Sequence, residues 1–229
     1  MRGSGQMTNA YDRSYLLHAR QVLGRMLDFA CHGLGYSARA FWEMFLASGV
    51  ASAFGAGEVR FIAGMSGYEL AYEVLDRCAE KYRRVVDPSP PDGKSPEFWA
   101  AWAIAHYQWL RGLDFARIYA VASIDDVVAM YHPYHEMDIS QFCDEMDRLY
   151  RVKFPECNLK RIRKSACLSQ SELAKRAGVS VRTIQELEQG RKDIGRAGMD
   201  TLMPLAAALS VNAESLVERV ACLDSADGV

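Results

Sequence analysis

The sequence lacks the features that mark membrane-spanning and secreted proteins. No apolar run reaches the roughly 18 residues that a membrane-spanning helix needs. The first residues, MRGSGQM, contain no apolar stretch of the kind found in signal peptides. We interpret residues 1–8 as a leader that is tag-derived or disordered, with Met7 as the native start. We therefore expect a cytoplasmic protein that does not associate with membranes.

Cysteine is present but has no spacing that indicates a shared site. None of the six cysteines forms a CxxC pair with another, so the sequence favours neither a zinc-ligand pattern nor a disulfide framework. We interpret them as reduced thiols that are mostly buried. They are Cys31, Cys78, Cys143, Cys157, Cys167 and Cys222.

The familiar catalytic and metal-binding motifs are also missing. There is no Ser-His-Asp order, phosphate-binding glycine loop or HExxH sequence. The segment YHPYHE holds His132, His135 and Glu136, with Cys143 nearby. Its histidines are too close for a helical i, i+4 pair, and Pro133 breaks the local helix. We therefore predict no metal site, no cofactor and no enzyme.

Paired acidic residues offer no better catalytic candidates. Asp125 and Asp126 follow a capping serine, so we interpret them as charges at the positive end of a helix. Glu145 and Asp147 are interpreted as surface charges.

The composition and the hydrophobic periodicity predict an all-α protein. Hydrophobic residues make up 50% of the chain and charged residues 24%, an ordinary globular balance. Apolar residues at i, i+3 and i+4 spacing, with capping residues, predict helices at residues 14–33, 37–48, 66–82, 95–113, 115–122, 123–131 and 139–151. The glycine-rich stretch 55–67 is predicted as a loop with a short helical turn or extended piece at 59–62. The proline-rich residues 83–94 are predicted as a surface loop.

Aromatic residues are concentrated in the predicted helix at 95–113. Trp99, Trp102, Tyr107 and Trp109 could line a small-molecule pocket, but aromatic residues at helical spacing more often form a core. We favour the core.

Charge is distributed unevenly along the chain. The net charge is −2, yet residues 157–219 carry 11 Lys and Arg against 7 Asp and Glu, a net +4. Residues 1–156 carry 16 against 20, a net −4. Because screening limits electrostatic effects to about 8 Å at physiological salt, the local charge matters more than the total. The positive C-terminal segment favours nucleic acid as its partner.

The positive segment also has the capping and turn residues of a helix-turn-helix unit. A first helix at 159–166 is predicted to be basic on its outer side, which carries Lys160, Arg161, Arg163 and Lys164. Ser169 and Glu172 then form a predicted capping box at the start of a second helix. Gly178 lies in the following turn, where glycine readily adopts a left-handed conformation. Ser180 is then predicted to cap a third helix, at 181–189, which Gly190 ends.

The stretch LSQSELAKRAGVSVRTIQELEQGRK closely resembles the Cro/C1-type (XRE) family of transcriptional regulators. The resemblance covers about 60 residues, since Leu202, Leu205, Ala206, Leu209, Val211 and Leu216 fit the family's fourth and fifth helices. It implies a five-helix, lambda-repressor-like domain. The positions that match the family pattern are Leu168, Ser169, Gln170, Glu172, Leu173, Ala174, Gly178, Val179, Ser180, Ile184, Glu188 and Gly190.

The resemblance implies that helix Val181–Gln189 enters the major groove of double-stranded operator DNA. Arg182 would pair with guanine, and Gln185 with adenine. Gln170 would hold the DNA backbone and brace Gln185, whereas Glu186 would accept from cytosine or point to solvent. The implied DNA-binding residues are Gln170, Ser180, Val181, Arg182, Thr183, Gln185, Glu186, Gln189, Arg191 and Lys192. Glu188 is interpreted as structural.

One residue departs from the family pattern. Pro204 falls in the middle of the predicted fourth helix, where it would kink or delay that helix.

The predicted organisation is a helical domain at 9–152, a linker at 153–157, the DNA-binding domain at 158–219 and a flexible tail at 220–229. The N-terminal domain would serve dimerisation, ligand binding or partner binding. Its stretches FIAGMSGYELAYEVL, SPEFWAAWAIAHYQWL and MYHPYHEMDISQF are weakly similar to the N-terminal regions of some XRE-type regulators.

We predict that the protein is a homodimeric transcriptional regulator that acts as a repressor. The alternative is an antitoxin whose N-terminal half binds a toxin while its DNA-binding domain represses the shared operon.

Overall fold

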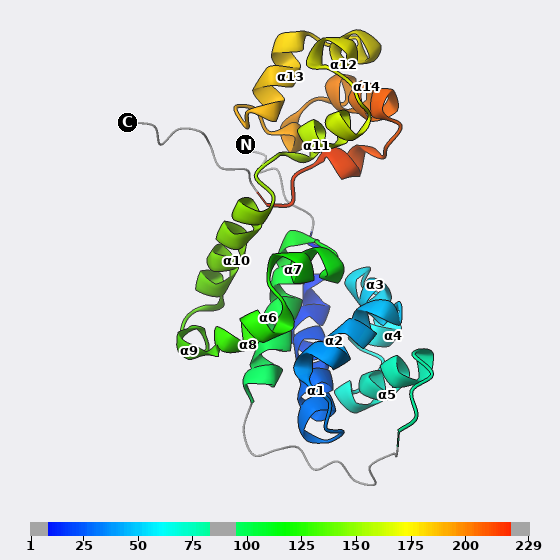
Figure 1. The fold of residues 1–229 in the computed structure, drawn as a ribbon, viewed down its shortest axis with the longest axis vertical. Helices are drawn as coiled ribbons and strands as arrows, with labels where there is room; N and C mark the ends of the chain where they lie inside the picture. Colours follow the sequence, from blue (N-terminus) through cyan, green and yellow to red (C-terminus); the bar gives the residue numbers. More distant parts are fainter. Residues whose placement is uncertain (1–8, 83–94, 221–229) are drawn as a thin grey trace. The chain divides into compact units, whose positions relative to one another are not determined.

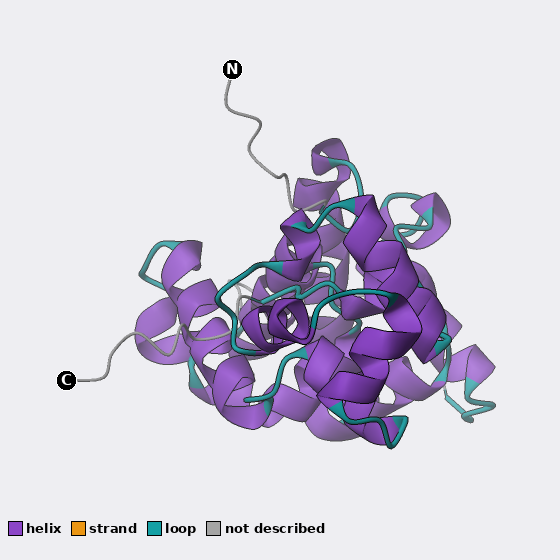
Figure 2. Cartoon of the chain, turned by 90° about the horizontal axis from the view of Figure 1, so that it is seen from above, coloured by secondary structure: helices purple, strands orange, loops and turns teal. Residues whose placement is uncertain are grey.

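The computed structural model describes residues 9–82 and 95–220. Within these residues every regular element is a helix, which confirms the predicted fold class (Figure 2). None of the described helices is long and apolar enough to cross a membrane. The predicted leader at 1–8, the proline-rich loop at 83–94 and residues 221–229 of the predicted tail lie outside the described residues.

The chain divides into two compact units, with the boundary between Leu149 and Tyr150. In the N-terminal unit α1 packs along α6 and α5, and Figure 1 shows the shorter helices gathered around this group. After a 3-10 turn at Arg13–Tyr15, the helices are α1 (Leu16–His32), α2 (Ala38–Ala47), α3 (Val50–Gly55), α4 (Val59–Ile62), α5 (Gly67–Arg77), α6 (Pro96–Arg111), α7 (Phe115–Val121), α8 (Ile124–Ala129), α9 (Tyr131–Tyr134) and α10 (Ile139–Lys153). The last residues of α10 lie beyond the boundary.

Short polar side chains set where these helices begin. Ser95 caps α6 by accepting a hydrogen bond from Phe98 N at 3.0 Å, and Pro96 occupies the first helical position. Ser66 and Ser123 form capping boxes with Glu69 and Asp126. The predicted helix starts at these three serines are therefore confirmed.

The region that follows α2 differs from the prediction. Gly49 adopts a left-handed conformation (φ 77°) that separates α2 from a further short helix, α3, which the sequence pattern did not indicate. Residues 59–62, left open between a helical turn and an extended piece, form the helix α4. Helix α5 ends at Arg77, before the predicted end at Tyr82.

Aromatic side chains fill much of the N-terminal core. Trp42, Tyr107, Phe41, Phe45, Phe54 and Phe115 are all at most 2% exposed. Phe115 lies in edge-to-face contact with Trp42, Phe45 and Phe54.

The interpretation of Asp147 as a surface charge is wrong, since only 7% of this residue is exposed. Its carboxylate accepts hydrogen bonds from the Tyr107 hydroxyl (2.9 Å) and from the Arg111 guanidinium. Hydrophobic periodicity could not reveal this, because Arg111 and Tyr107 lie 36 and 40 residues earlier in the chain, on α6.

The C-terminal unit contains α11 (Asn158–Ser165), α12 (Gln170–Ala177), α13 (Val181–Glu188) and α14 (Met199–Leu209), with 3-10 turns at Ile194–Arg196 and Ala213–Leu216. The predicted fifth helix is thus a single 3-10 turn. Helix α14 starts five residues before Pro204 and continues beyond it to Leu209, so the proline does not delay the helix. The core of the C-terminal unit is aliphatic and includes Leu159, Leu173, Ile184, Leu205 and Leu216.

Both ends of the predicted linker at 153–157 belong to the neighbouring helices. Lys153 ends α10. Cys157 caps α11, is 6% exposed and belongs to the C-terminal core.

Candidate DNA-binding surface

Helices α12 and α13 are joined by three residues, Gly178, Val179 and Ser180. Gly178 has φ 65°, a left-handed conformation that a side chain would disfavour, and its N–H closes α12 by donating to Ala174 O. Val179 packs against the aliphatic core. Ser180 caps α13 by accepting from Thr183 N at 3.0 Å. The turn predicted from the sequence is therefore present.

Helix α12 begins with the predicted capping box. Ser169 Oγ accepts from Glu172 N (3.1 Å), and Glu172 accepts from Ser169 N (2.7 Å). These hydrogen bonds keep the pKa of Glu172 below its usual value.

Helix α13 has one buried and one exposed face. Ile184 and Leu187 are buried in the core and hold the helix in the unit. The opposite side is formed by the exposed residues Val181, Arg182, Gln185 and Gln189, while Thr183 and Glu186 are partly buried. Ser180, Arg191 and Lys192, at the two ends, are also exposed. The structure therefore leaves most of the residues implied by the resemblance open to a partner.

The carboxylate of Glu186 forms ion pairs with two neighbouring cations. It accepts a hydrogen bond from Arg182 Nε at 2.9 Å and lies 2.7 Å from Lys192 Nζ. Hydrogen bonds from these two cations keep the pKa of Glu186 below its usual value, so that its carboxylate stays ionised. Glu186 thus holds two of the candidate DNA-binding cations together.

Gln170 differs from its implied role as a brace for Gln185. Its side-chain amide donates instead to Glu188 Oε2 at 2.8 Å. Glu188 also pairs with Arg163 through Nε (2.6 Å) and Nη2 (2.9 Å). The exposed fractions of the Arg163 and Glu188 side chains are 11% and 3%. The interpretation of Glu188 as structural is confirmed, because it joins α11, α12 and α13.

Arg163 also forms a hydrogen bond outside the ion pair with Glu188. Its Nη1 donates to Leu168 O at 2.7 Å, in the segment between α11 and α12. The hydrogen bonds to Glu188 raise the pKa of Arg163, so the guanidinium stays charged although it is buried. The prediction that Arg163 faces outward with the other cations of α11 is wrong, because Arg163 is buried as the partner of Glu188.

A surface hollow beside the end of α13 brings further cations to the same side of the unit. Lys192 and Arg196 line it together with the uncapped start of α14 at Gly198. Helix N-termini and cations are the groups that bind phosphate. Sequence reasoning missed Arg196, whose place beside α13 depends on the 3-10 turn at Ile194–Arg196. The full lining is Thr183, Leu187, Lys192, Asp193, Arg196, Ala197, Gly198 and Thr201.

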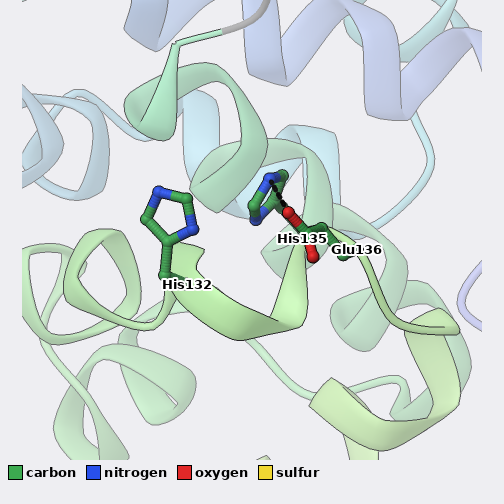
Figure 3. A group of neighbouring side chains, drawn as sticks. All are labelled: His132, His135 and Glu136. Carbon is green, nitrogen blue, oxygen red and sulfur yellow. Dashed lines mark ion pairs between the residues drawn. The ribbon is translucent and has the colours of Figure 1, made fainter.

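Two other sequence candidates lie in the N-terminal unit. Tyr107 and Trp109 are buried, as predicted for a core. Trp99 is buried as well, and together with the half-buried Trp102 it lines a pocket of about 200 Å³ with Phe98, Tyr131, Tyr134, His135, Met137 and Ile139. His132, His135 and Glu136, whose spacing was predicted to be too close for a helical ligand pair, lie near one another on a short segment (Figure 3), and His135 also lines this pocket.

Two short helices joined by a three-residue turn, with the second helix anchored by its apolar face and exposed on its polar face, define a helix-turn-helix DNA-binding domain. A helix-turn-helix family model matches residues 159–216, which confirms the XRE-type resemblance of this segment. No curated protein and no solved structure matched the chain. The N-terminal unit lies outside the matched range.

Proposed function

We propose that this chain is a sequence-specific repressor that inserts α13 into the major groove of operator DNA. The observation that carries the proposal is the polar face of α13, where Arg182, Gln185 and Gln189 are exposed while Ile184 and Leu187 fix the helix from behind. Arginine and glutamine are the side chains that form paired hydrogen bonds with guanine and adenine.

Phosphate contacts would come from both ends of this face. Arg191 and Lys192 follow α13 directly, and Arg196 adds a third cation beside the start of α14. In the described part of the chain no ion pair joins Arg191 to an acid, so its charge is fully available to phosphate. Such contacts fix the register of the domain on the duplex, while the base contacts supply the specificity.

The active species is proposed to be a homodimer. A single helix-turn-helix unit buries little surface on DNA, so two copies on half-sites about 34–36 Å apart supply the affinity and the symmetry. Sedimentation of the full chain with a DNA duplex tests this directly. Two chains per duplex are expected, and one chain per duplex contradicts the dimer.

Titration of DNA from the chain's own upstream region, at several salt concentrations, tests sequence-specific binding. We expect affinity that falls steeply with salt and that exceeds the affinity for a scrambled duplex. Arg182→Ala should cost about 1–3 kcal/mol and relax one operator position. Arg148→Ala, which removes an exposed arginine of the N-terminal unit, is the matched control and should leave the preference unchanged. Equal affinity for both duplexes, with no salt dependence, contradicts the proposal.

An antitoxin with the same DNA-binding domain makes a different prediction. Its acidic N-terminal half would hold a partner protein encoded beside it, and the net −4 of residues 1–156 is compatible with a basic partner. Co-expression with each adjacent gene separates the two functions. A neighbour that is toxic alone and co-purifies with this chain supports the antitoxin, whereas a chain that purifies alone beside harmless neighbours supports the simple repressor.

A further inference from the structure

Three side chains at α9 have the chemistry and the proximity of a metal site. One donor atom from each of His132, His135 and Glu136 can be chosen so that all three lie within 4.8 Å of one another. In the described part of the chain this is the one group of three such side chains close enough to share an ion. Figure 3 shows His135 and Glu136 in contact, with His132 on the same short segment.

The backbone explains why the sequence spacing was misleading. His132 precedes Pro133, and a residue before proline is disfavoured in the helical conformation. Accordingly, His132 has an extended backbone (φ −94°, ψ 126°) inside the segment assigned to α9. The ideal helical spacing of histidine pairs therefore does not apply here, and the proline that breaks the helix helps to bring the two rings together. Their centroids are 4.6 Å apart.

The ring of His135 is already oriented as a metal ligand requires. Its Nδ1 lies 2.8 Å from the backbone carbonyl of Tyr131, which can accept a hydrogen bond from it. That bond fixes the tautomer in which Nε2 carries the free lone pair. The ring is also stacked on Tyr131, with centroids 4.0 Å apart and an interplanar angle of 14°. Nε2 is thus held in place on the side of Glu136.

The distances require only a small adjustment. With zinc–ligand bonds of about 2.0–2.1 Å, neighbouring ligand atoms of a tetrahedral site lie about 3.3 Å apart. His135 Nε2 and Glu136 Oε1 are 3.4 Å apart, which fits that geometry without movement. His132 is exposed, and rotation of its ring can close the remaining gap of about 1.5 Å between 4.8 Å and that spacing.

We propose that His132, His135 and Glu136 bind one divalent transition-metal ion of the Zn²⁺ class. Two imidazoles and one carboxylate favour Zn²⁺, Ni²⁺ or Cu²⁺ over Mg²⁺ and Ca²⁺, which prefer oxygen ligands. Three protein ligands leave at least one coordination position for water or for another molecule. This inference concerns the N-terminal unit and stands independently of DNA binding.

Calorimetric titration of the metal-stripped full chain with Zn²⁺ alone tests the proposal. We expect one ion per chain, with the affinity reduced at least about tenfold by His135→Ala, His132→Ala or Glu136→Gln. His18→Ala removes an exposed histidine of α1 and is the matched control, with no effect expected. Since the three ligands lie on the surface or close to it, circular dichroism should show unchanged helicity in every variant.

A thiol site is the competing source of zinc binding, because Cys167 is exposed. Substitution of Co²⁺ for Zn²⁺ distinguishes the two, since thiolate ligands add a strong charge-transfer band that nitrogen and oxygen ligands do not. We expect no such band, and unchanged binding in Cys167→Ser. Absence of binding, binding that survives His132→Ala/His135→Ala together, or binding lost in Cys167→Ser would each overturn the proposal.

Discussion

The two units build their cores from different residues. Residues 157–229 contain no Phe, Trp or Tyr, so the C-terminal core consists of aliphatic side chains and small residues such as Ala174 and Ala206. The N-terminal core instead depends on large rings, from Trp42 to Phe142. Aromatic side chains bury about 150–250 Å² each. A small core without them offers less apolar surface to offset the conformational entropy lost on folding.

Both units nevertheless use the same polar arrangement. In each, a mostly buried carboxylate accepts hydrogen bonds from an arginine and from one uncharged donor on other helices. Asp147 binds Arg111 and Tyr107 in the N-terminal unit. Glu188 binds Arg163 and Gln170 in the C-terminal unit.

The difference lies in what the arrangement connects. Asp147 ties α10 to α6, whereas Glu188 ties the end of the candidate recognition helix to the start of α12. We infer that the smaller unit depends more strongly on its buried acid, and that its stability and its DNA-binding surface are linked through that residue.

The largest effect is expected for Glu188→Ala. Removing the acid leaves the buried Arg163 guanidinium without its counter-charge, which costs about 3–5 kcal/mol. Urea unfolding followed by far-UV circular dichroism should show an early transition of the C-terminal unit. All four tryptophans lie in the N-terminal unit, so the tryptophan fluorescence midpoint should stay unchanged.

Glu214→Ala removes an exposed acid from the same unit and serves as the control. We expect it to shift neither transition. If Glu188→Ala also leaves both transitions in place, the dependence of the C-terminal unit on this pair is wrong.

A smaller loss is expected for Asp147→Asn in the N-terminal unit. The Arg111 and Asp147 side chains are 18% and 10% exposed, so water reaches this pair more easily than the pair in the C-terminal unit. The cost should be about 1–3 kcal/mol, read as an earlier fluorescence transition in urea. Tyr107→Phe removes only the hydroxyl donor and should cost less. An equal loss of unfolding free energy in both variants would show that the tyrosine hydrogen bond, and not the ion pair, stabilises the unit.

The units should also respond differently to acid, since all five histidines precede residue 157. Burial, with a contribution from the positive Arg20, lowers the pKa of His106 from 6.5 to about 4. The unfolded chain therefore takes up the proton first, and the free energy of unfolding falls as the pH drops from 6.5 to 4. Because His106 is only partly buried, we expect about 1–2 kcal/mol.

Fluorescence-detected urea unfolding at pH 6.5 and pH 4 measures this loss. His106→Gln should remove that share of the pH dependence, while His18→Ala, at an exposed site of α1, should retain it. Identical pH dependence in His106→Gln and the unsubstituted chain would rule out this histidine as the cause.

Local signals predicted the fold well, because capping depends on neighbouring residues. Ser66, Ser95, Ser123, Ser169 and Ser180 all cap the helices expected of them. The errors arose where distant residues meet. The burial of Asp147 depends on α6, and the burial of Arg163 depends on the end of α13.

The candidate sites divide in the same way. The exposed face of α13 could be predicted because helical period and a specific family pattern both indicated it. The pairing of Glu186 with Lys192 could not, since it depends on how the chain turns after Gly190. Likewise, the proximity of His132 and His135 depends on a local departure from helical geometry.

The smallest effect is expected for Glu186→Gln, which tests how the exposed cations of the C-terminal unit are restrained. The substitution keeps the shape of the side chain but removes the charge that holds Arg182 and Lys192. Both cations then reach DNA without first breaking an ion pair. We expect affinity for a scrambled duplex to rise, and the salt dependence to steepen by up to about one phosphate contact.

Titrations of cognate and scrambled duplexes over a range of salt concentrations measure both quantities. If Glu186 acts only by restraining the cations, the cognate duplex gains affinity as well. If the carboxylate instead accepts a hydrogen bond from cytosine, the cognate duplex loses about 1–3 kcal/mol while the scrambled one still gains. The sign of the change on the cognate duplex thus decides whether Glu186 reads a base or restrains the residues that do.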